Sequence, residues 1–233
     1  MPGYLVKHEH IAIDGVADLQ IRSLLDRQQF SDPHDLALHQ GISSAAWPLF
    51  GLLWPSGLQL AARMAVRTMV PHERILEIGC GLALASLVSH RRGSDVTASD
   101  CHPLTAGFLA ENLRLNGLLP MAYRHGQWSE SADDLLPPVP QAEQTISGRF
   151  DLVIGSDILY ERDDGGLLAG FIGRHVSTRA EVWIVDPNRG NRAAFTRQMA
   201  SMGFSLQEER LQQVADATHL AYRGRLLVYR NFD

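Results

Sequence analysis

A carboxylate and a phenol follow a strand-like segment in the second half of this chain. Residues 150–156, FDLVIGS, are mostly apolar, and Asp157 comes directly after them, with Tyr160 three residues further on. Ligands of open α/β sheets bind at the carboxyl ends of the strands. A carboxylate there can accept hydrogen bonds from an amine and stabilise positive charge developing on it, and a tyrosine ring can pack against an alkylammonium chain. The structural alternative is that Asp157 caps the next segment and that Tyr160 packs in the core.

A glycine turn follows an earlier strand-like segment, RILEIG at residues 74–79. Gly79 and Gly81 permit a sharp turn and a close approach of the backbone to a ligand, and a helical pattern begins directly after them. Glu77 lies inside the strand, where a carboxylate is costly unless it is hydrogen-bonded or paired. A turn without a ligand would explain the two glycines alone. The strand before the turn and the helix after it favour a ligand-binding loop.

Asp100 ends the next strand-like segment, about twenty residues after the glycine turn. An acidic side chain at this spacing can bind both hydroxyls of a ribose. It could instead cap the helix that begins near Pro103. Considered together with the glycine turn, Asp100 favours a nucleoside ligand. Cys80 and Cys101 would then lie beside the ligand, and we interpret both as small packing residues.

Two further strand-like segments end in residues with more than one interpretation. Trp128 leaves the third segment, where its ring could cover a flat purine, although a core tryptophan is the simpler interpretation of that residue alone. Trp128 therefore supports a nucleotide site only in combination with the other strand ends. Asp186-Pro187 leaves the fifth segment and is typical of a turn, with Asn188 or Asn191 as the cap of the next helix.

Strand-like and helix-like segments alternate from residue 74 onward, which is typical of βαβ units and a parallel sheet. The expected strands are residues 74–79, 95–100, 121–128, 150–157, 180–186, 204–211 and 225–230. No convincing helix separates the last two, so we expect them to pair antiparallel. The predicted fold class is α/β: a Rossmann-like seven-strand sheet, mostly parallel with an antiparallel C-terminal strand, with helices on both faces and an N-terminal β-rich extension.

Composition narrows the class of protein. The net charge is −5 and no block of lysine and arginine stands out, so a nucleic-acid-binding groove is not expected. Two cysteines make no disulfide framework, and the N-terminal ten residues lack the apolar region of a secretion signal, which favours the cytoplasm.

Two other features of the N-terminal part carry weaker signals. Residues 36–62 have no charged side chain and could in principle span a bilayer, but Pro48 and Pro55 interrupt them. We interpret this segment as an aromatic-rich loop that leads into a helix. His8 and His10 share a strand face, yet no third ligand is evident, so no metal site is predicted.

Taken together, these motifs resemble the class I, seven-strand S-adenosylmethionine-dependent methyltransferases, whose cofactor motifs are similar to EIGCG at residues 77–81 followed by Asp100. More specifically, the chain resembles methyltransferase family 16 in LWPSG at residues 53–57, QW at 127–128 and SDILY at 156–160. This methyltransferase-like group contains many protein lysine methyltransferases. The resemblance covers roughly residues 45 to 230.

The resemblance implies S-adenosyl-L-methionine as the cofactor and a role for each matching position. The cofactor-binding residues would be Trp54, Glu77, Gly79, Cys80, Gly81, Asp100, Gln127, Trp128 and Ser156. Asp157 and Tyr160 would be catalytic, at the mouth through which the methyl-accepting nitrogen enters. The chain departs from the family pattern at Ala83, where glycine is common, and in the long acidic loop Ser129–Gly148.

The resulting expectation is an N-methyltransferase that acts on a lysine of another protein. A small-molecule amine N-methyltransferase is the alternative enzyme, and a non-catalytic protein that binds a nucleoside or a partner is the other alternative. A tetrapeptide of the Asn/Asp-Pro-Pro-Tyr type is absent after the fourth strand, so nucleic acid is not an expected partner. We expect an extension over residues 1–50, a methyltransferase domain over residues 51–233, a monomer, and no membrane partner.

Overall fold

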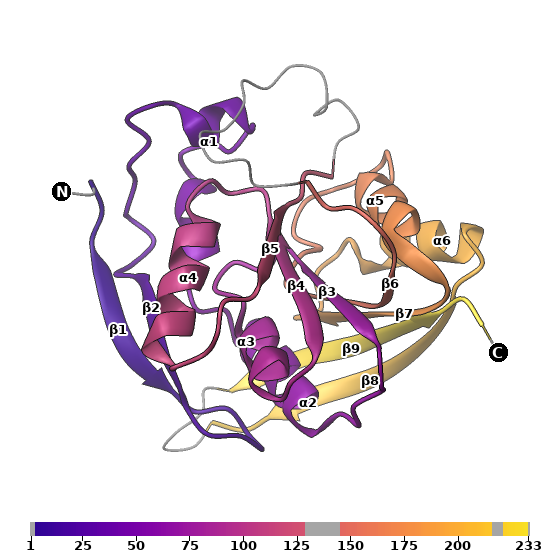
Figure 1. The fold of residues 1–233 in the computed structure, drawn as a ribbon. Coiled ribbons are helices and arrows are strands. Elements are labelled where there is room, and N and C mark those ends of the chain that lie inside the picture. Colours follow the sequence, from indigo (N-terminus) through magenta and orange to yellow (C-terminus); the bar gives the residue numbers. More distant parts are fainter. Residues whose placement is uncertain (1–2, 129–144, 216–220, 233) are drawn as a thin grey trace.

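A seven-strand sheet forms the centre of the molecule (Figure 1). The structure, a computed structural model, describes residues 3–128, 145–215 and 221–232. From one edge to the other, the strands are β5 (Ala122–His125), β4 (Asp95–Asp100), β3 (Arg74–Ile78), β6 (Phe150–Ser156), β7 (Val176–Asp186), β9 (Tyr222–Arg230) and β8 (Ser205–Gln213). The strand order reverses between β3 and β6, so ligands are expected where these two strands end.

Strand pairing agrees with the expected topology. The pairs β4–β5, β3–β4, β3–β6 and β6–β7 are parallel, and β9 runs antiparallel to both β7 and β8. The prediction of a mostly parallel sheet with an antiparallel strand at the C-terminus is therefore confirmed. Some boundaries differ: β7 begins four residues before the expected start at Ala180, β9 begins three residues before the expected start at Arg225, and β5 ends three residues before the expected end at Trp128.

Helices cover both faces of the sheet. A first hydrophobic cluster joins one face to α2 (Pro55–Val66), α3 (Leu84–Arg91) and α4 (Thr105–Leu115). A second cluster joins the other face to α5 (Leu167–His175) and α6 (Arg192–Ser201). The strands are consequently buried on both sides, which explains their continuous apolar sequences such as residues 152–154.

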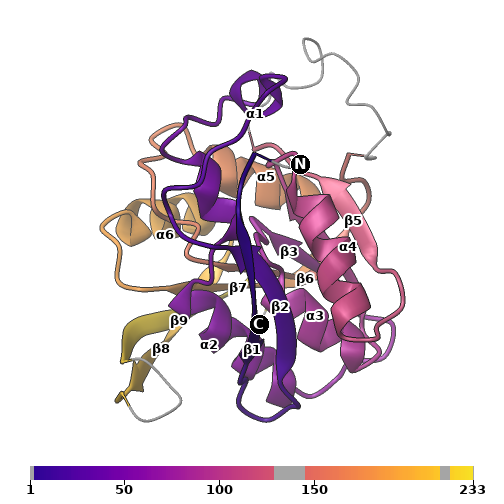
Figure 2. The same ribbon diagram turned by 90° about the vertical axis from the view of Figure 1, so that its left-hand side faces the viewer.

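The N-terminal part forms the expected small sheet. Strands β1 (Val6–Ile11) and β2 (Leu19–Leu24) pair antiparallel and lie beside α4 (Figures 1 and 2). The amide of Asn112 on α4 accepts a hydrogen bond from Arg22 N (2.7 Å) and donates one to Arg22 O (3.3 Å). The amide of Asn116, directly after α4, accepts a hydrogen bond from Gln20 N (3.0 Å) and donates one to Gln20 O (2.7 Å). Two helix side chains thus satisfy backbone groups along the free edge of β2.

The uncharged segment 36–62 contains α1 (Leu36–His39), the 3-10 helix η1 (Trp47–Gly51) and the first part of α2. Within the described ranges, none of the helices has the length and apolarity needed to cross a membrane. The ring of Phe50 in η1 stacks on the His102 ring, with centroids 3.7 Å apart and an interplanar angle of 13°. His102 follows β4, so this contact fixes η1 and the start of α2 against the ligand edge of the sheet.

Candidate active site

The glycine turn between β3 and α3 has an unusual backbone conformation. Gly79, Gly81 and Ala83 all have positive φ angles, of 55°, 51° and 56°. A Cβ atom on Gly81 would lie 2.9 Å from the carbonyl oxygen of Phe50, so only glycine fits there. Ala83 adopts the left-handed conformation despite its Cβ atom, at a cost of about 1 kcal/mol. The turn is therefore packed closely against the backbone of Phe50 in η1.

Asp100 holds this turn from the neighbouring strand. Its Oδ2 accepts a hydrogen bond from Gly81 N and its Oδ1 accepts one from His102 N, both at 2.9 Å. Burial raises the pKa of the Asp100 carboxyl, and these two hydrogen bonds act in the opposite direction. The carboxylate therefore fixes the loops that follow β3 and β4 relative to each other. Asp100 does not cap α4, because the N-cap residue of that helix is Leu104. Its hydrogen bond to His102 N caps only the turn that precedes the helix.

Glu77 joins β3 to α3. Its Oε2 accepts hydrogen bonds from Ser86 N (2.8 Å) and Ser86 Oγ (2.5 Å), which supplies the partners that a buried carboxylate needs. Burial raises the pKa of Glu77 to about 7, with a further contribution from the negative charge of Asp100. Its Oε1 receives no hydrogen bond from the described residues.

The remaining predicted cofactor residues lie around the same turn. Trp128 Cζ2 would be 3.6 Å from a Cβ atom on Gly79, so the indole comes close to the turn. Gln127 Oε1 is buried without a hydrogen-bond partner among the described residues. Such an acceptor is available to the amino group of a bound ligand. The Cys80 side chain is buried, and burial raises the pKa of its thiol well above the ordinary value, as expected for a packing residue.

The start of α2 approaches this site from the opposite side. Trp54 precedes α2, is half-buried, and donates from its indole Nε1 to Leu49 O (2.9 Å). A Cβ atom on Gly57 in the first turn of α2 would be 3.6 Å from Ser156 Oγ at the end of β6. Trp54 and Ser156 therefore belong to elements that meet at the strand ends. We call the glycine turn with Asp100 the cofactor half of the site.

Asp157 is fixed by both its backbone and its side chain. It has a left-handed backbone, with a φ angle of 58°, and its N–H donates to Val185 O (2.9 Å). Arg189, in the loop between β7 and α6, donates a hydrogen bond from Nε to Asp157 Oδ1 (2.5 Å), and its Nη2 forms an ion-pair contact with the same oxygen (2.5 Å). The Asp157 side chain is only 10% exposed. Because its carboxylate binds a guanidinium rather than a backbone N–H, the capping alternative for Asp157 is wrong.

Tyr160 lies at the surface, with 48% of its area exposed. The alternative of a packed core ring is therefore wrong as well. Burial raises the pKa of the Tyr160 hydroxyl to about 12, and the negative charges of Glu161 and Asp100 act in the same direction.

Asp186 and Tyr222 complete this region, and sequence reasoning assigned a chemical role to neither. Asp186 is fully buried; its Oδ2 accepts a hydrogen bond from Arg189 N (2.9 Å), and its Oδ1 has no partner among the described residues. Burial raises the pKa of the Asp186 carboxyl. The Tyr222 hydroxyl shares a hydrogen bond with Ser56 Oγ (3.0 Å), and the charges of Asp157 and Asp186 act on it.

We call Asp157, Asp186, Arg189 and Tyr222 the acceptor half. Asp186 ends a strand, as Asp100 does and as Asp157 nearly does. Because ligands bind at the carboxyl ends of the strands, the sequence could have indicated Asp186 as a site residue too.

The expected helix caps after β7 are wrong. Asn191 occupies the N-cap position of α6 but makes no side-chain cap, and its Nδ2 donates to Leu159 O (3.0 Å). Asn188 Oδ1 instead accepts a hydrogen bond from Arg225 Nε (3.1 Å). Asn191 connects this loop to the segment after β6 and Asn188 connects it to β9, which helps to hold the loop that carries Arg189.

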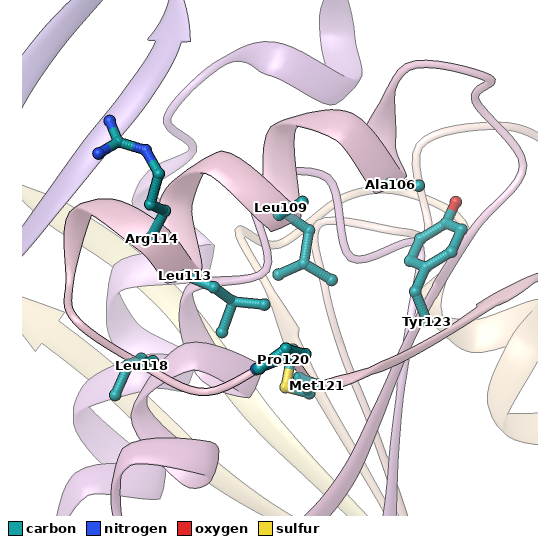
Figure 3. Close-up of a pocket in the computed structure, with 9 residues that line it drawn as sticks. Ala106, Leu109, Leu113, Arg114, Leu118, Pro120, Met121 and Tyr123 are labelled. Atoms are coloured by element: carbon teal, nitrogen blue, oxygen red, sulfur yellow. The ribbon is translucent and has the colours of Figure 1, made fainter.

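An apolar groove of about 410 Å³ lies elsewhere, between α4 and β5 (Figure 3). Its walls include Leu109, Leu113, Leu118 and Met121. It is separate from the glycine turn and contributes no carboxylate or nucleophile. Among the described residues, no cluster of three or more histidine, cysteine, aspartate or glutamate side chains could hold a metal ion.

Comparisons with known proteins identify the fold class. No family model matches the chain. Part of it is similar to the histone-arginine methyltransferase METTL23 of Rattus norvegicus and of Xenopus laevis, at 27% and 26% identity over 115 and 117 residues. Each match covers 48% of this chain and 47% or 45% of the relative. The chain thus spans about half the length of the curated relatives it matches.

Solved structures are similar over most of the chain. A ribosomal protein L11 methylase from Lactobacillus delbrueckii subsp. bulgaricus has a TM-score of 0.54 and 18% identity, covering 78% of this chain and 81% of its own. The magnesium protoporphyrin IX methyltransferase of Synechocystis PCC 6803 with bound SAM has a TM-score of 0.56 and 13% identity, covering 88% and 87%.

The fold is that of the class I S-adenosylmethionine-dependent methyltransferases, and the predicted fold class is confirmed. The finer resemblance to methyltransferase family 16 stays a prediction.

The residues of the cofactor half fit S-adenosylmethionine, the cofactor present in the Synechocystis structure. The glycine turn has the positive φ angles of a ligand-binding loop, and Asp100 provides a carboxylate beside the turn. The unpartnered Gln127 Oε1 provides an acceptor for an exocyclic amine. These are the groups that a ligand with an amino acid, a ribose and an adenine requires.

Proposed function

We propose that this protein transfers a methyl group from S-adenosylmethionine to a nitrogen of a protein side chain, with lysine as the acceptor. The observation that carries this proposal is the position of Asp157. It follows β6, which pairs directly with β3, and the next residue, Ile158, reaches the glycine turn, since a Cβ atom on Gly79 would lie 2.9 Å from Ile158 Cγ2. A ligand bound by the turn and a nitrogen bound by the carboxylate would be neighbours.

The cofactor half would bind and orient the cofactor, which supplies an electrophilic methyl group on a sulfonium. The backbone at Gly79 and Gly81 would follow its amino-acid part, and Asp100 would accept hydrogen bonds from its ribose hydroxyls. Trp128 and Trp54 would exclude water on either side. These assignments follow from the sequence motifs and agree with the positions of the side chains around the turn.

Asp157 would orient the acceptor nitrogen. Its Oδ1 binds Arg189, whereas its Oδ2 receives no hydrogen bond from the described residues and is available to an N–H of the acceptor. The hydrogen bond that Oδ2 would accept from the N–H of the acceptor would strengthen as positive charge develops on the nitrogen during methyl transfer. The exposed ring of Tyr160 would form one wall of the entrance for an alkyl chain.

Arginine is a second candidate acceptor, because the partial relatives from rat and frog are named histone-arginine methyltransferases. The contact between Asp157 and Arg189 also demonstrates that this carboxylate can bind a guanidinium. A small-molecule acceptor remains the alternative enzyme, as in the magnesium protoporphyrin methyltransferase. Fold alone does not choose among these acceptors.

Incubation with methyl-labelled S-adenosylmethionine and a lysate of the source cells tests the proposal. After acid hydrolysis of the protein fraction, we expect label in methylated lysine, and none when the Asp157→Asn variant replaces the wild type. Label in methylated arginine would mean that arginine, and not lysine, is the acceptor. Label only in small molecules would support a small-molecule amine methyltransferase. Cofactor binding without any labelled product would favour a non-catalytic nucleoside-binding protein.

A further inference from the structure

The contact between Asp157 and Arg189 changes the charge that the acceptor half presents to a ligand. Arg189 Nε donates to Asp157 Oδ1 and Nη2 forms an ion-pair contact with the same oxygen, so Arg189 neutralises the carboxylate while Oδ2 receives no hydrogen bond from the described residues. Charge-assisted hydrogen bonds of this type are among the stronger polar contacts. Asp157 is nearly buried whereas the Arg189 side chain is 35% exposed. Arg189 therefore reaches inward from the surface to a carboxylate that a ligand would otherwise meet with its full negative charge.

The backbone on both sides of this contact is anchored. Arg189 N donates to Asp186 Oδ2, and the preceding residue, Asn188, is bound by Arg225 of β9. Asp157 N is bound to Val185 O of β7. The loop therefore presents the guanidinium to Asp157 in a fixed direction.

An acceptor amine must give a lone pair to the methyl group, so its protonated form is unreactive. An unpaired carboxylate beside the amine would favour the ammonium form and raise the pKa of the amine. A guanidinium already bound to the carboxylate opposes a second cation, because like charges disfavour each other. The arrangement leaves Oδ2 as a hydrogen-bond acceptor in a site without net charge from the pair.

We propose that Arg189 is a positioning residue that makes Asp157 bind the acceptor nitrogen in its neutral, reactive form and reject the protonated form. This inference rests on the proposed function for the identity of the acceptor site. Arg189 contacts the carboxylate and not the reacting atoms. Other titratable groups facing this region are Asp100, Cys101, Tyr160, Glu161, Asp186 and Tyr222. None of them shares a hydrogen bond with the Asp157 carboxylate.

Binding of n-butylamine to the protein saturated with S-adenosylhomocysteine tests the inference without turnover. At pH 7.5 this probe is an ammonium ion, as a lysine side chain is. We expect Arg189→Gln to bind it roughly tenfold more tightly than the wild type, which corresponds to about 1.4 kcal/mol. The gain should disappear in Arg189→Gln/Asp157→Asn. Arg192→Gln is the matched control, because Arg192 pairs with Glu208 on the surface and should leave the affinity unchanged.

A second measurement uses the unmodified protein and does not depend on the folding of a variant. The wild type should bind n-butylamine increasingly tightly from pH 7.5 to 9.5, as the neutral fraction grows by roughly tenfold per pH unit. Affinity that is constant or falls with pH would overturn the inference, and so would equal affinity in Arg189→Gln and Arg192→Gln. Failure of the labelling experiment would instead overturn the proposed function, because the binding experiments involve no methyl transfer.

Discussion

In the cofactor half of the site, the Asp100 carboxylate binds two backbone N–H groups, those of Gly81 and His102. In the acceptor half, the Asp157 carboxylate binds the side chain of Arg189. The first arrangement forms part of the fold, since the loops that follow β3 and β4 depend on it. The second consists of a side-chain pair on an anchored loop, so its chemistry can change without a change of backbone.

Because of this difference, substitutions in the two halves should change different measured quantities. Changes in the cofactor half should alter cofactor affinity and stability together, because the same contacts serve both. Changes in the acceptor half should alter turnover and acceptor affinity while the cofactor still binds. Four variants test this separation, from the largest expected effect to the smallest.

Asp157→Asn should reduce kcat by about a hundredfold or more while leaving cofactor affinity nearly unchanged. The amide keeps the shape of the side chain but is a weaker hydrogen-bond acceptor than the carboxylate for the N–H of the acceptor nitrogen, and this hydrogen bond matters most as positive charge develops there. Turnover of the acceptor found by labelling and calorimetry with S-adenosylhomocysteine measure the two quantities. Asp164→Asn, which breaks the exposed pair with Arg162, is the matched control. Unchanged kcat in a protein with a lowered melting temperature would assign Asp157 a structural role.

Gly81→Ala should weaken cofactor binding by roughly thirtyfold, about 2 kcal/mol. Its φ angle of 51° strains any residue with a Cβ atom, and that atom would lie 2.9 Å from Phe50 O. The turn must therefore move away from the cofactor or displace η1. Gly107→Ala is the control, because Gly107 lies in α4 and a Cβ atom there would meet nothing within 4 Å. Equal calorimetric affinities in the two variants would contradict a cradle at Gly81.

Asp100→Ala should weaken cofactor binding about tenfold and lower the melting temperature, since Gly81 and His102 both lose a hydrogen-bond acceptor. Asp163→Ala provides the matched comparison. Asp163 also accepts two backbone N–H groups, those of Leu167 and Leu168 at the start of α5. We expect that variant to melt lower with undiminished cofactor affinity. Undiminished affinity in Asp100→Ala would remove Asp100 from the site.

Much of the fold and of the cofactor half could be predicted because the responsible signals are local. Glycines that need positive φ angles and an acidic residue at a strand end both appear directly in the sequence. The acceptor half was predicted less well because its contacts depend on strand neighbours. Arg189 reaches Asp157 only because β6 and β7 are paired and their ends lie side by side.

Two other features required the folded chain. The stacking of Phe50 on His102 joins residues 52 positions apart in the sequence, and no spacing rule connects them. Hydrogen bonds of Asn188 to Arg225 of β9 and of Asn191 to Leu159 O overrode the usual preference of asparagine for helix caps. Tertiary partners thus decided the roles of polar residues whose local preferences indicated something else.

The last variant, Glu77→Gln, tests the hydrogen bonds that join β3 to α3 under the cofactor half. Burial raises the pKa of Glu77 from 4.5 to about 7, so between these values the folded protein holds a proton that the unfolded chain has lost. The free energy of unfolding of the wild type must then decrease as pH rises through this range, by about 1 kcal/mol between pH 6 and 8. Burial lowers the pKa of His102 to about 3, which acts in the opposite direction below pH 6.5.

The informative quantity is therefore the melting temperature of Glu77→Gln minus that of the wild type, in which the contribution of His102 cancels. Glutamine has no proton to lose, and its amide oxygen can still accept the hydrogen bonds from Ser86. The difference should increase by about 2–4 °C between pH 6 and 8. Ser89→Ala is a control, since it removes a buried helix hydroxyl that donates to Ala85 O and has no carboxylate partner. A difference that stays constant with pH would mean that Glu77 is already ionised at pH 6, and that the connection between β3 and α3 is a charged one.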